Sequence, residues 1–525
     1  MRTRGTYTGF VQTGLVQKLF AAALALAGIL LVRYAWAESL HEHALLNAES
    51  AVALSFLILL FLRGTAKESL KGDADLSIWW LAAIPAVIAL AFAGILNAPF
   101  LYDDYTHITD AAQASWASIA QQFGPVEHKP GLFFRPVGFA IYWWHYQLLS
   151  GHPELWHPAS LALHVICAFL VFCLIRLVGL SRLAGLAGAL LFAMNGVTAE
   201  AVAWIDARFD LIATLLVLLS LILIFRYADT GVFGWMAGAL AAGVCAMLTK
   251  ESAFALPLLA SCLPVIDSRL RNRRIWRAVL SMAILSAVLF AYRWWALGGI
   301  GGYGTRLSIS HSLNALFFRQ WALLFFPLNW AAAGPLARAA ACAIAVVLLV
   351  SAWIAKPSRG MLAGSVAFVI ACALPVQHLL SIGSALPNSR FLYMGAVGWA
   401  LLSAVVVDGM PAKPRILMPC LLLLIEFPLL ENNLAIWREN ADLARSACAS
   451  FGRMVASERF AVVRRLPSTR KGAVFLANGF PQCVAMHSGV PAERILVRDA
   501  EPDAHYSGVR EFIWNESRER FEQSR

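Results

Sequence analysis

Apolar runs long enough to cross a bilayer recur along most of this chain, first at roughly 17–37, 47–63 and 78–98. A helix of about 20 apolar residues spans the hydrocarbon core of a membrane. The 525 residues are 60% hydrophobic and 14% charged, whereas soluble domains are about 25% charged. A soluble enzyme would lack the polar surface to cover such a core. The sequence therefore predicts a polytopic α-helical membrane protein.

The runs that follow predict about 13 transmembrane helices in all. The further spans are expected at 157–178, 183–199, 209–228, 232–248, 253–267, 277–297, 336–355, 361–380, 391–408 and 415–431. The stretch 313–330 is also apolar, but it carries Arg319, Pro327 and Asn329. We interpret it as a re-entrant or interfacial segment, because these residues are costly in contact with lipid.

The formal net charge of +11 indicates membrane topology rather than nucleic-acid binding, because of where the basic residues lie. Basic residues gather in alternate loops, above all in the arginine cluster 269–277, and such loops stay on the cytoplasmic side. This places the N-terminus inside and the C-terminus outside. If 313–330 were a full span, everything after it would invert. The first run ends in a small-x-small pattern at 35–37, but an uncleaved helix is preferred because its leading stretch is long.

Three regions are expected along the chain. Residues 1–75 form an N-terminal extension with two transmembrane helices, and 76–431 form the transmembrane core. Within that core, the polar interval 98–156 is rich in aromatic residues, which predicts an external catalytic loop with amphipathic helices on the membrane surface. Residues 432–525 are polar with short β-like runs, and they predict a small external α/β domain.

Charged residues cluster at the helix ends assigned to the external side. They are Asp103, Asp104, Arg135, Glu200, Asp206, Arg208, Asp210, Lys250, Glu251 and Arg390. Charges near a membrane usually face a cavity or a partner, so these six segments are predicted to converge on one pocket just outside the bilayer. The alternative is a set of polar helix ends and interfacial ion pairs.

Within this set, the adjacent carboxylates Asp103 and Asp104 directly follow a helix. Neighbouring carboxylates repel each other, which raises the pKa of one of them. One carboxylate can then act as a general base on a substrate hydroxyl while the other orients that hydroxyl. Asp206 and Asp210 share a helical face. Lys250 would hold a phosphate as a point charge while Glu251 orients it.

Another candidate is His164, which lies inside an apolar span; there a packed, hydrogen-bonded histidine competes with a role in the pocket. The nine cysteines include seven in apolar runs, and they show no spacing for zinc.

These segments together resemble the GT-C class of membrane glycosyltransferases, in particular bacterial relatives of the transmembrane and tetratricopeptide-repeat O-mannosyltransferases. The matching segments, in chain order, are Phe100–Asp104, Phe134–Pro136, His157–His164, Leu191–Val202, Asp206–Leu211, Leu248–Glu251, Ser389–Tyr393 and Trp437–Arg438. The match covers roughly 90–440. The chain departs from these relatives at Met194-Asn195, where a His-Pro pair is common, and it has no repeat array.

The resemblance implies an external active site and a polyprenyl-phosphate-sugar donor. Asp103 or Asp104 would be the catalytic base. Lys250 and Arg390 match basic positions suited to the donor phosphate, and we add Arg208 and Arg135 to them. No metal ligand set or cofactor is predicted, although the acidic pair would tolerate a divalent cation.

The expected activity is inverting transfer of a sugar to a hydroxyl on a protein, glycan or lipid, on the external, periplasmic side of a multi-pass inner-membrane protein. A transporter or lipid flippase is the alternative, and a membrane scaffold is a third. A transporter would favour midplane charges and an internal repeat, whereas the charges here lie at one surface.

Overall fold

The computed structural model describes residues 7–37, 41–65, 77–125, 133–302, 308–380, 385–498 and 509–524, with the side chains of 7–13 left out. Lys67 and Lys71, two basic residues of the first loop that the charge pattern assigns to the cytoplasm, lie outside the described residues.

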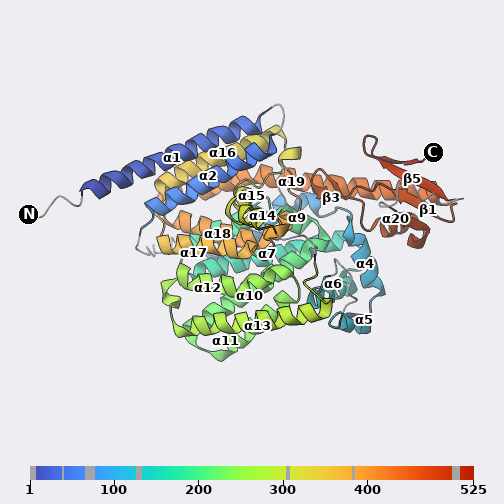
Figure 1. Cartoon of the computed structure of the whole chain (residues 1–525), viewed down its shortest axis with the longest axis horizontal. Helices are drawn as coiled ribbons and strands as arrows, with labels where there is room; N and C mark the ends of the chain where they lie inside the picture. The colour runs from blue at the N-terminus through green and yellow to red at the C-terminus, as the bar shows by residue number, and fades with distance from the viewer. Residues whose placement is uncertain are drawn as a thin grey trace, which may run out of the picture.

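The described chain is dominated by long helices that run side by side (Figure 1). The N-terminal pair is α1 (Tyr7–Ala35) and α2 (Glu42–Arg63), followed by η1 (Ile78–Ala82), α3 (Ala83–Ala91) and η2 (Ala93–Ile95). The central helices are α7 (Pro153–Leu177), α8 (Arg182–Met194), α9 (Thr198–Ala203), η3 (Ile205–Ala207), α10 (Arg208–Thr230), α11 (Phe233–Met247), η4 (Glu251–Ala255), α12 (Leu256–Ile266), η5 (Ser268–Leu270) and α13 (Arg273–Leu297). They are followed by α16 (Pro335–Ile354), α17 (Arg359–Ala373), η8 (Gln377–Leu379), η9 (Ser389–Leu392) and α18 (Tyr393–Asp408).

Seven helices of the described residues are long and apolar enough to cross a membrane, and five shorter apolar helices accompany them. The predicted fold class, a polytopic helical membrane protein with a small C-terminal sheet, is confirmed. The number of 13 spans stays a prediction.

Helix α18 forms the centre of the bundle, because every residue from Tyr393 to Asp408 is buried. It packs against α8 and α17. Glycines permit this approach: a Cβ on Gly188 would lie 2.9 Å from the carbonyl oxygen of Ala400, and one on Gly398 would lie 2.5 Å from the Val369 side chain. Close contact through small residues is the usual way in which membrane helices associate.

The basic loops meet at one end of the bundle. Arg269 donates to the carbonyl of Leu177 over 3.0 Å, and Arg415 contacts Ser181. Thr65 lies beside Ser358 in a parallel bridge. The loops assigned to the cytoplasm therefore share one end of the molecule, as the alternating charge pattern requires.

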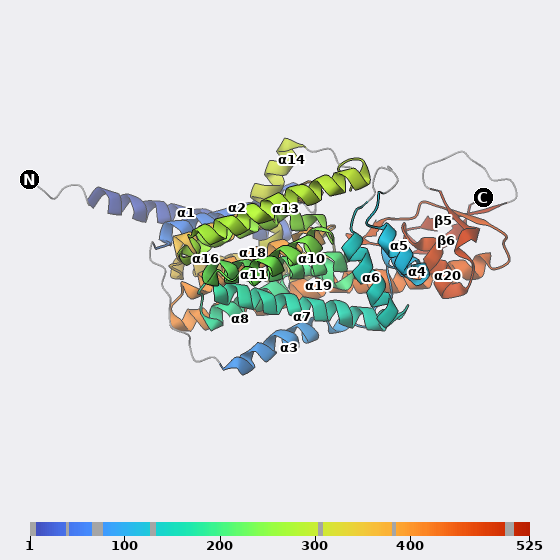
Figure 2. The same ribbon diagram turned by 90° about the horizontal axis from the view of Figure 1, so that it is seen from below.

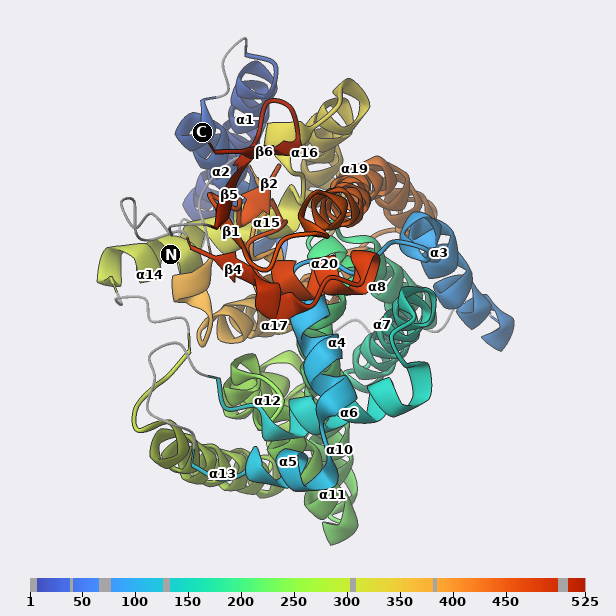
Figure 3. The same cartoon turned by 90° about the vertical axis from the view of Figure 1, so that its right-hand side faces the viewer.

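The opposite end carries α4 (Asp103–Gln113), α5 (Trp116–Gln121) and α6 (Pro136–Leu149), which are shorter than the core helices. Helix α4 lies beside the C-terminal domain, and α6 and α5 follow beyond it in the end-on view (Figure 3). They occupy the interval 98–156, where external helices are predicted.

The apolar stretch 313–330 forms a helix with a π-turn. It consists of α14 (Ile309–Asn314), the π-helix η6 (Ala315–Arg319) and α15 (Gln320–Phe325), and is followed by η7 (Trp330–Ala332). In Figure 2, α14 projects from the bundle. The segment packs against α2, and it is not among the helices long and apolar enough to span.

One expectation about the last span is wrong. A span at 415–431 followed by a separate tail from 432 is replaced by one 44-residue helix, α19 (Ala412–Val455). Asn433, Trp437 and Asn440 are buried on one face of the helix. The helix therefore continues past 431 because this face packs against the rest of the protein, although the sequence there is polar.

The C-terminal domain follows α19 as the predicted small α/β unit. Its strands are β1 (Ala461–Arg464), β2 (Thr469–Arg470), β3 (Ala473–Val474), β4 (Ile495–Val497), β5 (Arg510–Asn515) and β6 (Arg520–Gln523), with α20 (Phe480–Ser488) and η10 (Ala492–Arg494). The main sheet has the order β4-β1-β5-β6, parallel except for β6. A disulfide between Cys448 and Cys483 ties α19 to α20.

Candidate active site

The acidic pair opens helix α4, and its two carboxylates have different surroundings. Asp104 is 1% exposed; one of its oxygens accepts the backbone N–H of Leu101 at 2.9 Å and the other accepts that of Asp206 at 2.8 Å. Burial raises the pKa of Asp104 well above its usual range. Asp104 thus joins the start of α4 to the turn before α10, and both of its oxygens are used in doing so.

Asp103 is only partly buried, and it lies between both signs of charge. Its carboxylate is hydrogen-bonded to the side chain of Asn478, from the C-terminal domain. Burial and the neighbouring Asp206 raise the pKa of Asp103 to about 6, against the opposing effects of His107, Asn478 and Arg390. A carboxyl group with this pKa is ionised at neutral pH and takes up a proton readily.

His107 is a site residue that the sequence reasoning missed. Its Nδ1 contacts the carboxylate of Asp206 in a close ion pair. Burial alone would lower the pKa of His107, but Asp206 and Asp103 raise it to about 9, so the imidazole is protonated at neutral pH. The spacing of His107 from Asp103 was the available signal, since residues four apart share a helix face.

Two clusters bring the predicted basic residues to the same end of the bundle. Lys250 donates to Asp210 at 3.0 Å, and both side chains are 4% exposed. Arg135 donates hydrogen bonds to the carboxylate of Glu251 from two of its nitrogens, at 2.7 and 3.1 Å. Arg293, a second missed residue, donates to the same carboxylate at 3.1 Å.

A third buried pair joins Arg390 to Glu200, with Ser389 donating to the same carboxylate at 3.1 Å. The guanidinium of Arg390 also lies over the ring of Trp204, 4.8 Å from its centroid. Arg390 therefore fixes η9 against α9.

Arg208 and His164 lie deeper in the protein. Arg208 is 0% exposed and donates to the Trp156 carbonyl at 3.1 Å and to Ser160 at 2.9 Å. His164 is also fully buried; it accepts from Tyr393 at 2.7 Å and donates to a backbone carbonyl at 3.1 Å. These contacts hold helices together, which corresponds to the packed alternative considered for His164.

Two cavities adjoin these clusters. One of about 220 Å³ has a mixed wall of cationic and apolar side chains, including Lys250, Arg293, Phe254, Phe290 and Phe391. The other, of about 410 Å³, lies over α4, α5 and α6 and is lined by His107, Asp110, Gln113, Tyr142 and Trp143 among others. In the part of the chain that the structure describes, no group of three or more His, Cys, Asp and Glu side chains could hold a metal ion.

The chain is similar in sequence to a protein named as an O-mannosyl-transferase. No family model matches the chain. The human protein O-mannosyl-transferase TMTC1 is 27% identical over 191 residues, which is 33% of this chain and 22% of that protein. The chain therefore matches only about a fifth of the length of this curated relative.

Solved structures show a similar, distant likeness. ArnT from Cupriavidus metallidurans bound to undecaprenyl phosphate is 13% identical with a TM-score of 0.43, covering 84% of this chain and 94% of that one. The arabinofuranosyltransferase AftD from mycobacteria is 14% identical with a TM-score of 0.42, covering 83% and 32%. The Archaeoglobus fulgidus oligosaccharyltransferase tethered with an acceptor peptide is 11% identical with a TM-score of 0.42, covering 80% and 64%. The resemblance to O-mannosyltransferases predicted from the ordered motifs has a counterpart in the likeness to TMTC1 over 191 residues, and membership of the GT-C class stays a prediction.

Proposed function

We propose that this protein is an inverting glycosyltransferase that moves a sugar from a polyprenyl-phosphate donor to a hydroxyl acceptor on the external face of the membrane. The observation that carries the proposal is Asp103. It is a partly buried carboxylate with a pKa raised to about 6, at the end of the bundle where the basic clusters gather.

Asp103 suits the role of general base better than Asp104. Both oxygens of Asp104 accept backbone N–H groups, so protonation there would weaken the link between α4 and η3. Asp103 takes the proton of the acceptor hydroxyl while the oxygen of that hydroxyl forms a bond to the anomeric carbon of the sugar. The bond from that carbon to the phosphate oxygen breaks on the opposite face, and its electron pair leaves with polyprenyl phosphate.

The phosphate is assigned to the 220 Å³ cavity. Lys250 and Arg293 line it beside Phe254, Phe290 and Phe391, so it offers cations to a phosphate and apolar rings to an isoprenoid chain. Preorganised cations favour the transition state because negative charge grows on the departing phosphate. Arg135 supports Arg293 through their shared Glu251, and Arg390 and Arg208 act as positioning residues.

The sugar and acceptor are assigned to the 410 Å³ cavity, whose wall includes Tyr142 and His107, one helical turn after Asp103 on α4. A cavity with aromatic walls and a few convergent polar groups is the usual form of a small-molecule site. The likeness to an O-mannosyl-transferase supports a hydroxyl acceptor.

The external location is supported by the disulfide Cys448–Cys483. Disulfides persist in oxidising compartments such as the periplasm and are rare in the cytosol. The bond lies in the same domain as Asn478, which touches Asp103, so domain and site share one side of the membrane.

The test is sugar transfer by isolated membranes that contain the protein, using polyprenyl phosphate loaded with radiolabelled mannose and then with a panel of other sugars. Asp103→Asn should lower kcat by roughly 10²–10⁴-fold, the usual contribution of general-base catalysis. The control is Asp229→Asn, an exposed carboxylate at the other end of α10. Full activity of Asp103→Asn would reject Asp103 as the base, and no transfer from any donor would reject the function.

A further inference from the structure

A third cavity, of about 540 Å³, lies far from the acidic residues of the candidate site, among η1, α7, α8 and α10. The helix directions place it at the opposite end of the bundle. Helices α7 and α10 begin beside the candidate active site and reach the cavity near their last turns, at Arg176 and Arg226. No step of the proposed transfer reaction uses this cavity.

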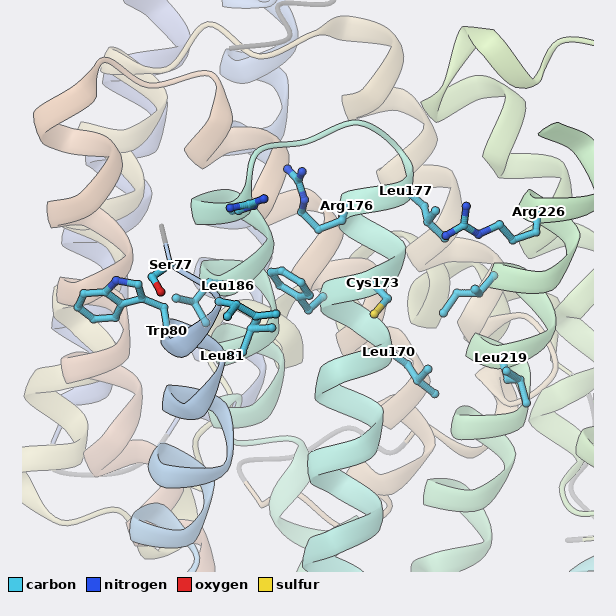
Figure 4. A pocket seen from close by; sticks show the side chains of 14 residues that line it. Ser77, Trp80, Leu81, Leu170, Cys173, Arg176, Leu177, Leu186, Leu219 and Arg226 are labelled. Atoms are coloured by element: carbon cyan, nitrogen blue, oxygen red, sulfur yellow. The ribbon is translucent and has the colours of Figure 1, made fainter. Parts of the chain in front are cut away.

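The cavity is strongly amphiphilic. In Figure 4, Arg176 and Arg226 lie level with each other on neighbouring helices, while Leu170, Cys173 and Leu219 lie below them. Arg182, from the first turn of α8, is a third arginine in its wall. The remaining lining is largely aliphatic and aromatic, with Ser77 as a small polar group.

Two further features point to a lipid. Ile78 and Trp80 line the cavity and are 73% and 57% exposed, and exposed tryptophan is typical of the level of lipid headgroups. The side chain of Arg176 is held over the cavity end of α7 by its bond to the Leu180 carbonyl at 2.5 Å. A fixed guanidinium loses less rotamer entropy when it receives an anion.

We propose that this cavity binds an anionic glycerophospholipid of the membrane leaflet at the basic end of the bundle. The headgroup phosphate would contact Arg176, Arg182 and Arg226, and an acyl chain would follow the wall formed by Leu170 and Leu219. Charge complementarity carries the choice of ligand, because basic pockets between transmembrane helices select acidic headgroups. The alternative is that these arginines serve only as topology signals.

The first experiment is native mass spectrometry of the full-length protein in detergent, with equimolar phosphatidylglycerol, phosphatidylcholine and undecaprenyl phosphate added after delipidation. The parent protein should retain phosphatidylglycerol, and Arg176→Gln/Arg182→Gln/Arg226→Gln should lower that occupancy at least tenfold. The matched control removes three exposed basic residues of the same end, by Arg273→Gln/Arg277→Gln/Lys413→Gln, and should bind as the parent does.

A second measurement avoids dependence on the folding of the triple variant. Cys173 lines the cavity, whereas Cys420 is an exposed cysteine of α19 outside it. Phosphatidylglycerol should slow the labelling of Cys173 by N-ethylmaleimide in the parent protein and leave Cys420 unchanged; phosphatidylcholine should slow neither.

Equal phosphatidylglycerol occupancy in the parent and the triple variant would overturn the proposal, as would a triple variant that loses undecaprenyl phosphate or phosphatidylcholine instead of phosphatidylglycerol. Equal labelling of Cys173 with and without phosphatidylglycerol would do the same. None of these outcomes depends on whether the protein transfers sugar.

Discussion

The pH dependence of sugar transfer offers the sharpest test of the proposed base. The raised pKa of Asp103 lies below neutral pH, and the raised pKa of the neighbouring His107 lies above it. Asp103 must be ionised to accept a proton, and burial raises its pKa to about 6. A group with that pKa is about 90% ionised at pH 7 and about 10% at pH 5, so kcat/KM should fall roughly tenfold over this interval. The usual aspartate pKa of about 3.9 would leave activity nearly unchanged there.

The variant His107→Gln gives the same experiment an internal check. The imidazolium of His107 lowers the pKa of Asp103, so its removal should move the acid limb to higher pH. The parent should also lose activity above about pH 9, where His107 loses its proton and leaves Asp206 uncompensated, and the variant should lack this alkaline limb.

The assay is initial-rate transfer of label from a polyprenyl-phosphate sugar at limiting donor, from pH 4.5 to 10, with protein stability followed at each pH. Asp229→Asn serves as the carboxylate control and should keep the parent profile. An acid limb centred near pH 4, or one that stays in place in His107→Gln, would refute the assignment of Asp103 as a base tuned by its surroundings.

Four further outcomes are expected. Arg390→Gln should destabilise the protein by about 3–5 kcal/mol because it leaves the buried carboxylate of Glu200 unpaired; thermal unfolding should show much of this loss recovered in the double variant Arg390→Gln/Glu200→Gln, and additive losses would contradict the pairing. Arg293→Gln should raise the donor KM and lower kcat together, by about tenfold or more for a charge-assisted bond of roughly 1.5–3 kcal/mol, and a normal donor titration would remove Arg293 from the phosphate site. Gly479→Ala should lower kcat, since φ is +70° there and the new Cβ would lie 2.3 Å from a carbonyl oxygen at the start of α4; unchanged kinetics would mean that this approach is unimportant. A reporter fused after Arg277 should read as cytoplasmic and one at the C-terminus as external, and the same side for both would contradict the topology.

The apolar runs were enough to predict the fold class, because a helix surrounded by lipid must be apolar whatever its neighbours are. The prediction failed at α19, where two features conceal the helix. Pro419 and Pro428 lie inside it, and the polar residues after 431 read as a tail. Tertiary burial of Asn433 and Asn440 keeps that part helical, and a single sequence does not reveal such burial.

The gathering of charges at one end could likewise be predicted, but their pairing could not. Lys250 pairs with Asp210 rather than with its neighbour Glu251, which instead binds Arg135 from 116 positions away. Partners so distant in sequence are chosen by helix packing, which local spacing does not encode. Arg293 was also missed, because it lies near the end of an apolar span and its sequence position resembles that of an interfacial anchor.

The C-terminal domain belongs to the candidate site as much as the transmembrane helices do. Its Asn478 contacts the carboxylate of Asp103 and lowers the pKa of that group, while His487 hydrogen-bonds with Tyr105 at 3.1 Å on the same helix. The domain is held in turn by the Cys448–Cys483 disulfide to α19, the helix that leaves the bundle. A displacement of the domain would remove Asn478 from Asp103 and expose the carboxylate to water. Loss of Asn478 would raise the pKa of Asp103 and hydration would lower it, so the C-terminal domain contributes to the basicity of the proposed base alongside Asp206 and His107.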